Sequence, residues 1–432
     1  MKLVGVYTSQ RDVLEAAKTG VLEWLKDNLG LNLVIVSGGI PSPEVIAKTP
    51  IKVVSETGDR LSETVNEAHK KDIGVWLVYS TFAEMAGGPT YPDLAFRDIE
   101  GNIVAPESKH GSGWAWSWCP SNPRLREYYA ALYNDLTKRY DVDGFTISHN
   151  RYSPPGHEFY NLFGCACPNC VKTAAELGYD FPRMKASLQT LLRNLKQVDW
   201  KKLEALAEVG PSFLDFLYYA GPDTGLIDWV NFRCDLILTA LKKFYEAVKE
   251  AREDITFGQD TFPPSFSLLA GHKYRELEAT ADFLSPLLSH PFLFIIFSFM
   301  ETTAHLIEWN RSLRERAVLK VLYRLFGYDK LAMPESLNAL VETKPIPSSD
   351  FSATKVPVPD IIKLECLKAG AMARRRVPIY PVIAARNEVT AEGATARVKA
   401  VKEAGLDGVI LQVSGFPGRE DNLAAVSGVL RE

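Results

Sequence analysis

The sequence predicts an α/β protein built as a (β/α)₈ TIM barrel. Eight short apolar segments, rich in Val, Ile, Phe and Tyr, recur along the 432 residues. Their hydrophobicity is nearly continuous rather than alternating, which is typical of parallel strands covered on both faces. Helical stretches separate them, and such alternation indicates a barrel, with an open doubly wound sheet as the alternative. The segments are 3–8, 31–37, 73–80, 144–149, 255–260, 282–288, 377–384 and 408–414.

Helix signals lie between these segments. Residues 60–71 and 123–140 precede the third and fourth strands, and Pro123 suits the first turn of its helix. Residues 227–252 and 392–404 precede the fifth and eighth strands. No G-x-G-x-x-G or G-x-x-x-x-G-K-[ST] motif follows a strand, so nucleotide binding is not expected.

Unusually long connections follow the third, fourth and sixth strands. We expect one barrel domain over residues 1–432, with an insertion at 150–226 that is helical around 184–208 and contains cysteines. Residues 329–358 form a second long connection, rich in Pro and Ser. Connections that follow barrel strands lie at the C-terminal face, where active sites of this fold are built.

Composition and charge limit the partners and the compartment. The hydrophobic fraction is 46%, the charged fraction 24% and the net charge −4, which gives no basic surface for nucleic acid or an anionic membrane. MKLVGVYTSQ lacks the pattern of a signal peptide, and Pro291–Met300 is too short to span a bilayer. We expect a cytoplasmic protein whose six cysteines are reduced.

Three motifs resemble a known group of enzymes. They are WCPSNPRLREYYAALYNDLTKRYDVDGF (118–145), CACPNCVKTAAELGYD (165–180) and FGQDTFPPSFSLLAGHKYRELEATADFLSPLL (257–288). Their order and spacing resemble the hypothetical glycosyl hydrolase families with amylase-like barrels, over most of residues 116–290. The resemblance implies a (β/α)₈ fold and hydrolysis of glycosidic bonds.

The fourth strand departs from the amylase-like pattern. That pattern reads D-G-F-R-x-D, and its last aspartate is the nucleophile. Alignment on Asp143-Gly144-Phe145 places Thr146 at the arginine and Ser148 at the nucleophile. Serine cannot take over a carboxylate's role without a base and a different chemistry, so the amylase mechanism is not carried over to this chain.

A glycosidase usually needs two carboxyl groups that flank the scissile bond. Asp260 ends the fifth strand, and the resemblance implies a catalytic acid or nucleophile there; the alternative is a turn cap. Glu388 lies just beyond the seventh strand and is the candidate partner, unless it serves only as a first-turn helix residue. Glu84, after the third strand, is a weaker candidate for the same role.

Other polar and aromatic residues at strand ends could position a sugar. Aromatic faces stack on sugar rings, while imidazole, guanidinium and amide groups bind hydroxyls. For each of them, local packing is the competing interpretation. The candidates are His149, Arg151, Tyr152, Trp116, His290 and Gln412.

Cys165, Cys167 and Cys170 form a C-x-C-x-x-C motif. Thiolates at this spacing can bind a structural zinc with a fourth ligand from elsewhere, for which Cys119, His157 and Cys234 are candidates. The alternative is a reduced, cysteine-rich turn. No cofactor is expected for catalysis.

The sequence therefore predicts a glycoside hydrolase that acts on an oligo- or polysaccharide by carboxylate acid/base catalysis. The alternative is a non-catalytic saccharide-binding barrel that has lost its strand-four nucleophile, which Ser148 favours. An unrelated metal-dependent barrel enzyme ranks last, because no H-x-H motif lies at the first strand.

Overall fold

The computed structural model contains a parallel barrel of eight strands. It describes residues 1–51, 59–84, 90–104, 116–156, 159–212, 214–215, 218, 223–340, 356–374, 376–386, 389–413, 415–416 and 420–431. The strand order is β8-β7-β6-β3-β2-β1-β10-β9, and every pairing is parallel. The strands are β1 (Leu3–Tyr7), β2 (Leu33–Val36), β3 (Gly74–Ser80), β6 (Gly144–Ser148), β7 (Thr256–Thr261), β8 (Phe283–Pro286), β9 (Val382–Ala384) and β10 (Gly408–Gln412).

The two end strands, β8 and β9, meet and close the barrel. Parallel bridges join Leu284 to Ile379 and Leu287 to Val382. The Leu288 amide donates to the Val382 carbonyl at 3.0 Å, and the Tyr380 amide donates to the Leu284 carbonyl at 2.9 Å. All eight predicted strands are therefore present, and the sheet is a barrel rather than an open doubly wound sheet.

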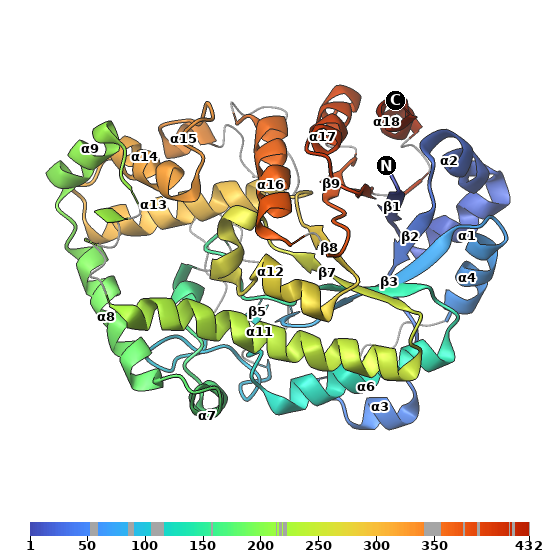
Figure 1. Ribbon diagram of the computed structural model, residues 1–432, viewed down its shortest axis with the longest axis horizontal. Helices are drawn as coiled ribbons and strands as arrows, with labels where there is room; N and C mark the ends of the chain where they lie inside the picture. Colours follow the sequence, from blue (N-terminus) through green and yellow to red (C-terminus); the bar gives the residue numbers. More distant parts are fainter. Residues whose placement is uncertain are drawn as a thin grey trace.

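Helices connect successive strands and cover the barrel (Figure 1). Those that precede β3, β6, β7 and β10 match the predicted helices closely. The α-helices are α1 (Gln10–Thr19), α2 (Val21–Leu29), α3 (Pro43–Ala47), α4 (Leu61–His69), α6 (Pro123–Arg139), α7 (Pro168–Glu176), α8 (Phe181–Lys196), α9 (Trp200–Val209), α11 (Thr224–Ala251), α12 (Tyr274–Leu277), α13 (Phe297–Trp309), α14 (Glu315–Phe326), α15 (Leu337–Leu340), α16 (Val358–Met372), α17 (Ala391–Glu403) and α18 (Glu420–Arg431).

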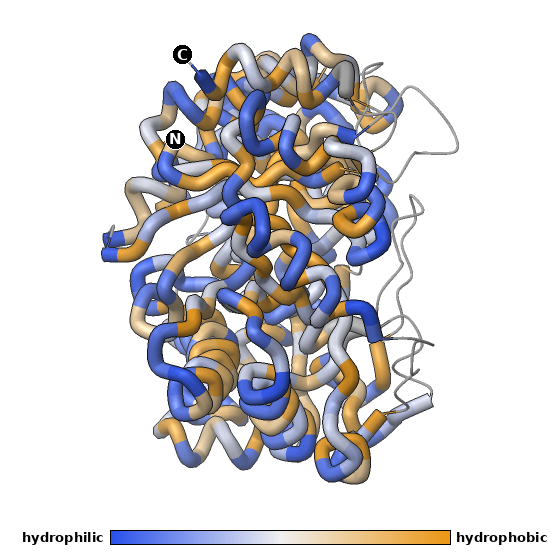
Figure 2. Tube along the Cα trace, turned by 90° about the vertical axis from the view of Figure 1, so that its right-hand side faces the viewer, coloured by the Kyte–Doolittle hydropathy of each residue, from blue (hydrophilic) through white to orange (hydrophobic). Residues whose placement is uncertain are grey.

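Local sequence explains where these helices begin and end. Before α6, the Asn122 side chain accepts hydrogen bonds from the amides of Arg124 and Leu125, and Pro123 occupies the first turn. After α17, Gly405 takes a φ of 69°, which ends the helix. Hydrophobic and hydrophilic residues alternate along the helices (Figure 2), as expected for helices with one buried face.

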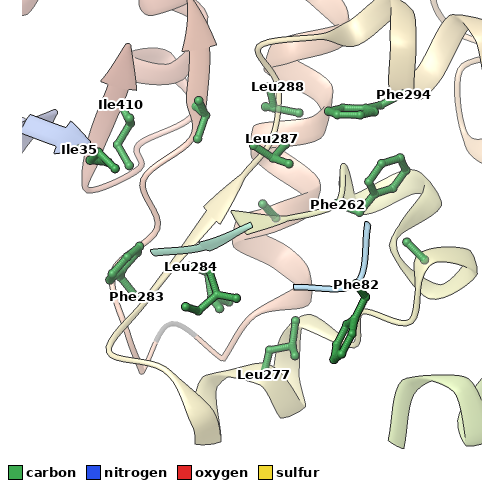
Figure 3. Packing of buried hydrophobic residues seen from close by; sticks show 14 of the residues in the cluster. Ile35, Phe82, Phe262, Leu277, Phe283, Leu284, Leu287, Leu288, Phe294 and Ile410 are labelled. Atoms are coloured by element: carbon green, nitrogen blue, oxygen red, sulfur yellow. The ribbon is translucent and has the colours of Figure 1, made fainter. Parts of the chain in front are cut away.

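Aromatic side chains fill the lower half of the barrel. The Trp76 ring of β3 stacks on Phe283 of β8, with ring centroids 4.3 Å apart. Gly144 and Gly258 face these rings, and a Cβ atom at either position would overlap Trp76 or Phe283 respectively. Figure 3 shows Phe283 among the buried side chains, with Ile35 and Ile410 nearby. The filled floor leaves polar chemistry to the C-terminal ends of the strands.

The long connections after β6 and β8 pack against each other at one side of the barrel. Helix α9 contacts α14, and α8 contacts α13, in the lobe on the left of Figure 1. The insertion after the fourth strand thus carries α7, α8 and α9, as predicted. A short 3₁₀ helix, η1 (Phe159–Phe163), lies in the connection after β6, and two more, η2 (Pro264–Ala270) and η3 (Glu278–Thr280), lie between β7 and β8.

The apolar segment at 291–300 forms a π-helical turn, η4 (Phe292–Ile296), that runs into α13. Together they give one helix, Phe292–Trp309, which is longer than the sequence suggested and long enough to cross a membrane. Its 18 residues are 61% buried within the protein. Such burial is typical of a core helix, and length alone is weak evidence for a membrane span.

Candidate active site

Polar side chains face inward at the C-terminal ends of the strands, and we call six of them the barrel mouth. Asp260 of β7 accepts hydrogen bonds at Oδ1 from Tyr7 of β1 (2.9 Å) and Thr146 of β6 (3.4 Å). Because paired residues of parallel strands face the same side, Ser285, opposite Asp260, and Gln412, opposite Tyr7, point inward too. The barrel mouth consists of Tyr7, Thr146, Ser148, Asp260, Ser285 and Gln412.

Asp260 is the one acidic member of this group. Its side chain is 2% exposed, and this burial raises the pKa of its carboxyl to about 6. Hydrogen bonds from Ser148, Tyr7 and Thr146, and the positive charge of Arg151, oppose that rise in pKa. A carboxyl group with these neighbours changes protonation near neutral pH, which is what a general acid or base requires.

Ser148 lies at the strand end where its alignment with a nucleophile places it, but it has a different role. Its hydroxyl donates a hydrogen bond to Asp260 and favours the ionised carboxylate. Ser148 therefore supports the neighbouring strand's carboxyl group, and the acidic group at the barrel mouth is carried by the fifth strand.

The chain turns sharply after β6. His149 adopts a φ of 50°, which is uncommon for a residue other than glycine, and its Nδ1 lies 2.8 Å from the Ser80 hydroxyl. The Asn150 side-chain amide donates to Gln259 Oε1 at 3.4 Å. This turn fixes the start of the inserted segment beside the barrel mouth.

Arg151 lies buried beside Asp260. Its guanidinium packs over the rings of Phe262 (4.9 Å) and Phe294 (5.1 Å), which lie close together above the strands in Figure 3. Burial lowers the pKa of Arg151 to about 10, and the negative charge of Asp260 opposes this. Its Nε and Nη2 have no hydrogen-bond partner among the described residues.

His290 follows β8 and also reaches this region. Its Nδ1 lies 2.8 Å from the Ser289 hydroxyl, and its ring packs edge-on against Phe294, 5.7 Å between centroids. Burial, Arg386 and Arg151 lower the pKa of His290 to about 3. Burial, Arg151 and His290 lower the pKa of His149 to about 3 as well. Both imidazoles are therefore neutral at pH 7.

Gln412 and Ser285 each contribute a polar atom that makes no hydrogen bond to the described residues. Gln412 Oε1 and Ser285 Oγ are buried without a hydrogen bond in the described part of the chain. Buried polar atoms in proteins are normally satisfied by protein, water or ligand. Their position in the barrel mouth suits contact with a hydroxylated ligand.

Tyr152 lies apart from the barrel mouth, unlike the expectation that it would contact a sugar. Its ring is 1% exposed and packs under the Arg233 guanidinium (4.1 Å) and against Phe96 (5.8 Å). It neighbours the cysteines instead, because successive residues after a strand point in different directions.

Three other predicted residues cannot be compared with their expected positions. Glu388 lies outside the described residues. Trp116 lies in β5 (Trp116–Ser117), which pairs with β4 (Ala83–Glu84), but the side chains of Trp116 and Glu84 are outside what the structure describes. Their roles stay predictions.

Four buried cysteines come together next to Tyr152. The sulfur atoms of Cys119, Cys165, Cys167 and Cys170 all lie within 4.8 Å of one another. Cys119 Sγ lies 3.3 Å from Cys170 Sγ and 3.4 Å from Cys167 Sγ, distances too long for a disulfide. Of the three candidates for the fourth ligand, the structure selects Cys119; Cys234 is elsewhere, and His157 is outside the described residues.

This cysteine cluster fits a zinc ion. A tetrahedral zinc with four thiolates at about 2.3 Å holds its sulfur atoms roughly 3.8 Å apart, close to the spacing observed. Burial raises the pKa of Cys165 and Cys170, whereas hydrogen bonds from the neighbouring thiols lower the pKa of Cys167. A bound cation would stabilise the buried thiolates. Four protein ligands would leave no open position for a substrate.

Tyr7 is a site residue that the sequence reasoning missed. It ends the first strand, and its place in the alternation Leu3, Gly5, Tyr7 could have shown that it faces inward. Its bond to Asp260 crosses the barrel, which no local pattern reveals.

Comparisons with known proteins agree on the fold. No protein-family model matches the sequence, and no curated protein matches it either. The PgaB (BpsB) glycoside hydrolase domain from Bordetella bronchiseptica superposes with a TM-score of 0.56 and 12% identity, over 100% of this chain and 99% of that one. A beta-galactosidase from Halorubrum lacusprofundi superposes with a TM-score of 0.52 and 15% identity, over 99% of this chain and 58% of that one.

An alpha-L-fucosidase isoenzyme 2 from Paenibacillus thiaminolyticus gives a TM-score of 0.50 and 11% identity, over 100% of this chain and 49% of that one. The chain thus spans nearly all of the PgaB domain but only about half of each of the other two proteins. At these identities the likeness establishes the fold, a (β/α)₈ barrel of the kind found in glycoside hydrolases.

Proposed function

We propose that this protein is a glycoside hydrolase and that Asp260 is one of its catalytic carboxyl groups. The observation that carries the proposal is the position of Asp260: buried, inward-facing at a strand's C-terminal end, and held by Tyr7, Thr146 and Ser148. Strand-end polar groups of this fold are where catalysis usually occurs. The named activities of the structurally similar proteins are consistent with the proposal.

Asp260 suits the role of the general acid. With a pKa of about 6, a substantial share of the carboxyl group is protonated at mildly acidic pH. The protonated group would give its proton to the glycosidic oxygen as the bond to the anomeric carbon breaks, and water would supply the hydroxyl of the new sugar end.

A second carboxyl group is needed to attack the anomeric carbon or to activate water. Glu388 is the proposed partner, because it follows the seventh strand, and Glu84 is the alternative. A separation of roughly 5 Å from Asp260 would give retention, and roughly 6.5–9.5 Å inversion. His149, Arg151, His290 and Gln412 are proposed to position the carbohydrate.

The test is hydrolysis of a panel of oligosaccharides and aryl glycosides by the wild type, Asp260→Asn and Glu388→Gln. Turnover that both substitutions abolish supports the proposal, and the anomer first released gives the stereochemistry. Loss in Asp260→Asn alone would assign the partner to another carboxyl, and Glu84→Gln is then the next variant.

A saccharide-binding barrel without catalysis is the second candidate, and it is favoured because Asp260 is the one acidic side chain in the described part of the barrel mouth. It predicts that carbohydrate binding persists in Asp260→Asn while no panel member is hydrolysed by either protein. Unchanged turnover in Asp260→Asn would contradict our assignment.

We also propose that the cysteine cluster binds one structural zinc ion. The four sulfur atoms, their burial and their spacing support this. The ion would fasten Cys119, which precedes α6, to the inserted segment after β6, and it would take no part in the reaction.

Four free thiols also suit a reducing compartment, so a cytoplasmic location is proposed, to be tested by cell fractionation.

A further inference from the structure

The described contacts of Arg151, with two aromatic rings and the charge of Asp260, leave part of its hydrogen-bonding capacity unused. Arg151 is 2% exposed, so its charge is removed from water. Its Nε and Nη2 have no hydrogen-bond partner among the described residues, Asp260 included. Buried N–H groups without hydrogen-bond partners are costly, and at the mouth of a barrel a ligand can supply the missing partners.

The aromatic rings around Arg151 determine how it can bind. The rings of Phe262 and Phe294 pack on the guanidinium at 4.9 and 5.1 Å, and phenyl rings offer no hydrogen-bond partner in the plane of that group. Stacked in this way, the group can use only the N–H groups at its edge. That fork of parallel donors matches the two oxygens of a carboxylate or a sulfate.

Among the described residues, two arginines and one carboxyl group act electrostatically on this region. Arg386, beyond β9, and Arg151 both act electrostatically on His290, and Arg151 also acts on His149. Asp260 is the one acidic group of the barrel mouth, and burial holds part of it protonated near neutral pH. The two guanidinium groups would attract an anionic group on a ligand, whereas a neutral sugar would not gain this attraction.

We propose that the sugar unit bound at the barrel mouth carries an anionic group, a carboxylate or a sulfate ester, and that Arg151 receives it, with Arg386 nearby. This inference rests on the proposed carbohydrate function and narrows it to acidic sugars. Neutral His149 and His290 would add hydrogen bonds to the same unit without adding charge.

The test measures binding of matched monosaccharides by calorimetry. The pairs are D-glucuronate with D-glucose, D-galacturonate with D-galactose, and D-galactose 6-sulfate with D-galactose. We expect the anionic member of at least one pair to bind about ten- to one-hundred-fold more tightly, as one charge-assisted bidentate contact allows. The uronate and sulfate arms distinguish the two anions.

Arg151→Gln should remove that preference, and Arg386→Gln should reduce it. Arg233→Gln is the matched control: this buried arginine also stacks on an aromatic ring and leaves Nε and Nη2 without partners, but it lies beside the cysteine cluster. Its variant should keep the preference. Should Arg151→Gln fail to fold, Arg151→Lys, which keeps the charge and loses the fork, replaces it.

Equal or weaker binding of the anionic members, or no binding of either class, would overturn the inference, as would a preference that survives in Arg151→Gln. Kinetics on aryl glucosides and aryl glucuronides separate it from the proposed function. Anion binding without turnover of any glycoside would support the proposed anion site and contradict the proposed hydrolase activity. Turnover confined to neutral glycosides would retain the hydrolase and remove the anion site.

Discussion

Two buried arginines, Arg151 and Arg233, both stack on aromatic rings, but the ionisable groups that surround them differ. Each stacks on aromatic rings, at 4.9 Å over Phe262 and 4.1 Å over Tyr152. Burial lowers the pKa of both guanidinium groups. Arg151, however, lies within electrostatic reach of Asp260, whereas Arg233 lies near Tyr152 and the thiols of the cysteine cluster.

The difference teaches how this chain separates chemistry from support. Asp260 extends from a strand that is paired on both sides, so the barrel itself holds its position. The four cysteines come from two connecting segments outside the barrel sheet, which short bridges such as Ala95–Trp118 and Asp98–Gly164 join to other segments. The barrel mouth around Asp260 is therefore suited to bind a ligand, and the cysteine cluster is suited to bind a metal ion that links its two segments. The following predictions test that division, beginning with the largest expected effect.

Asp260→Asn should lower kcat/KM for the best substrate by about 10²–10⁴-fold, because amide cannot transfer the proton. Asp143→Asn is the control at the opposite end of the barrel, where Asp143 Oδ2 accepts a hydrogen bond from the Val75 amide at 2.7 Å. It should reduce stability and leave kcat/KM nearly unchanged. Equal losses of kcat/KM in the two variants would break the proposed comparison.

Removal of zinc should affect stability more than chemistry. Wild type should contain about one zinc per chain by elemental analysis, and Cys170→Ser should lose it together with several kcal/mol of unfolding free energy. Cys234→Ser, at a buried cysteine outside the cluster, should keep the metal. A metal-free wild type that unfolds at the same temperature with and without added zinc would contradict the staple.

Asp260 should make the protein less stable as the pH rises. Its pKa is about 6 when folded and near 3.9 when unfolded, so the folded state binds the proton more tightly. The resulting stability is present below pH 4 and is lost as the pH rises through 6. Relative to wild type, Asp260→Asn should therefore gain up to about 3 kcal/mol between pH 4 and pH 8.

Chemical denaturation of both proteins at the two pH values measures this gain. The prediction fails if the difference in unfolding free energy between the two proteins does not change with pH. A gain in stability together with a loss of activity would show that the buried carboxyl is kept for chemistry rather than for the fold.

Tyr7→Phe should have the smallest effect. It removes a hydrogen bond that lowers the pKa of Asp260, so that pKa should rise. If Asp260 acts as the acid, the fall of kcat/KM at high pH should move upward by about one pH unit. Tyr328→Phe, which breaks a hydrogen bond to Glu365 outside the barrel mouth, should leave the profile in place. A downward movement would indicate that Asp260 acts ionised.

Much of the barrel could be predicted from the sequence alone. Each strand is an apolar run covered on both faces, so its hydrophobic pattern is local and legible, and all eight were found within a few residues. The position of Asp260 at the barrel mouth could be predicted for the same reason. A polar residue near the end of an apolar strand is expected to face the polar C-terminal end of the barrel. The C-x-C-x-x-C spacing likewise predicted that its three thiols could lie close together, and the structure brings them within reach of one another.

What only the tertiary structure decided depends on contacts between residues far apart in the chain. The bond from Tyr7 to Asp260, the choice of Cys119 as the fourth thiol, and the support that Ser148 gives to Asp260 each join separate strands or loops. Tyr152 points away from the mouth, and Phe262 and Phe294 pack on Arg151. Both features follow from the irregular backbone after β6, where side-chain directions do not repeat regularly along the sequence. Hydrophobic patterning encodes regular elements, whereas the site depends on how those elements and their loops meet.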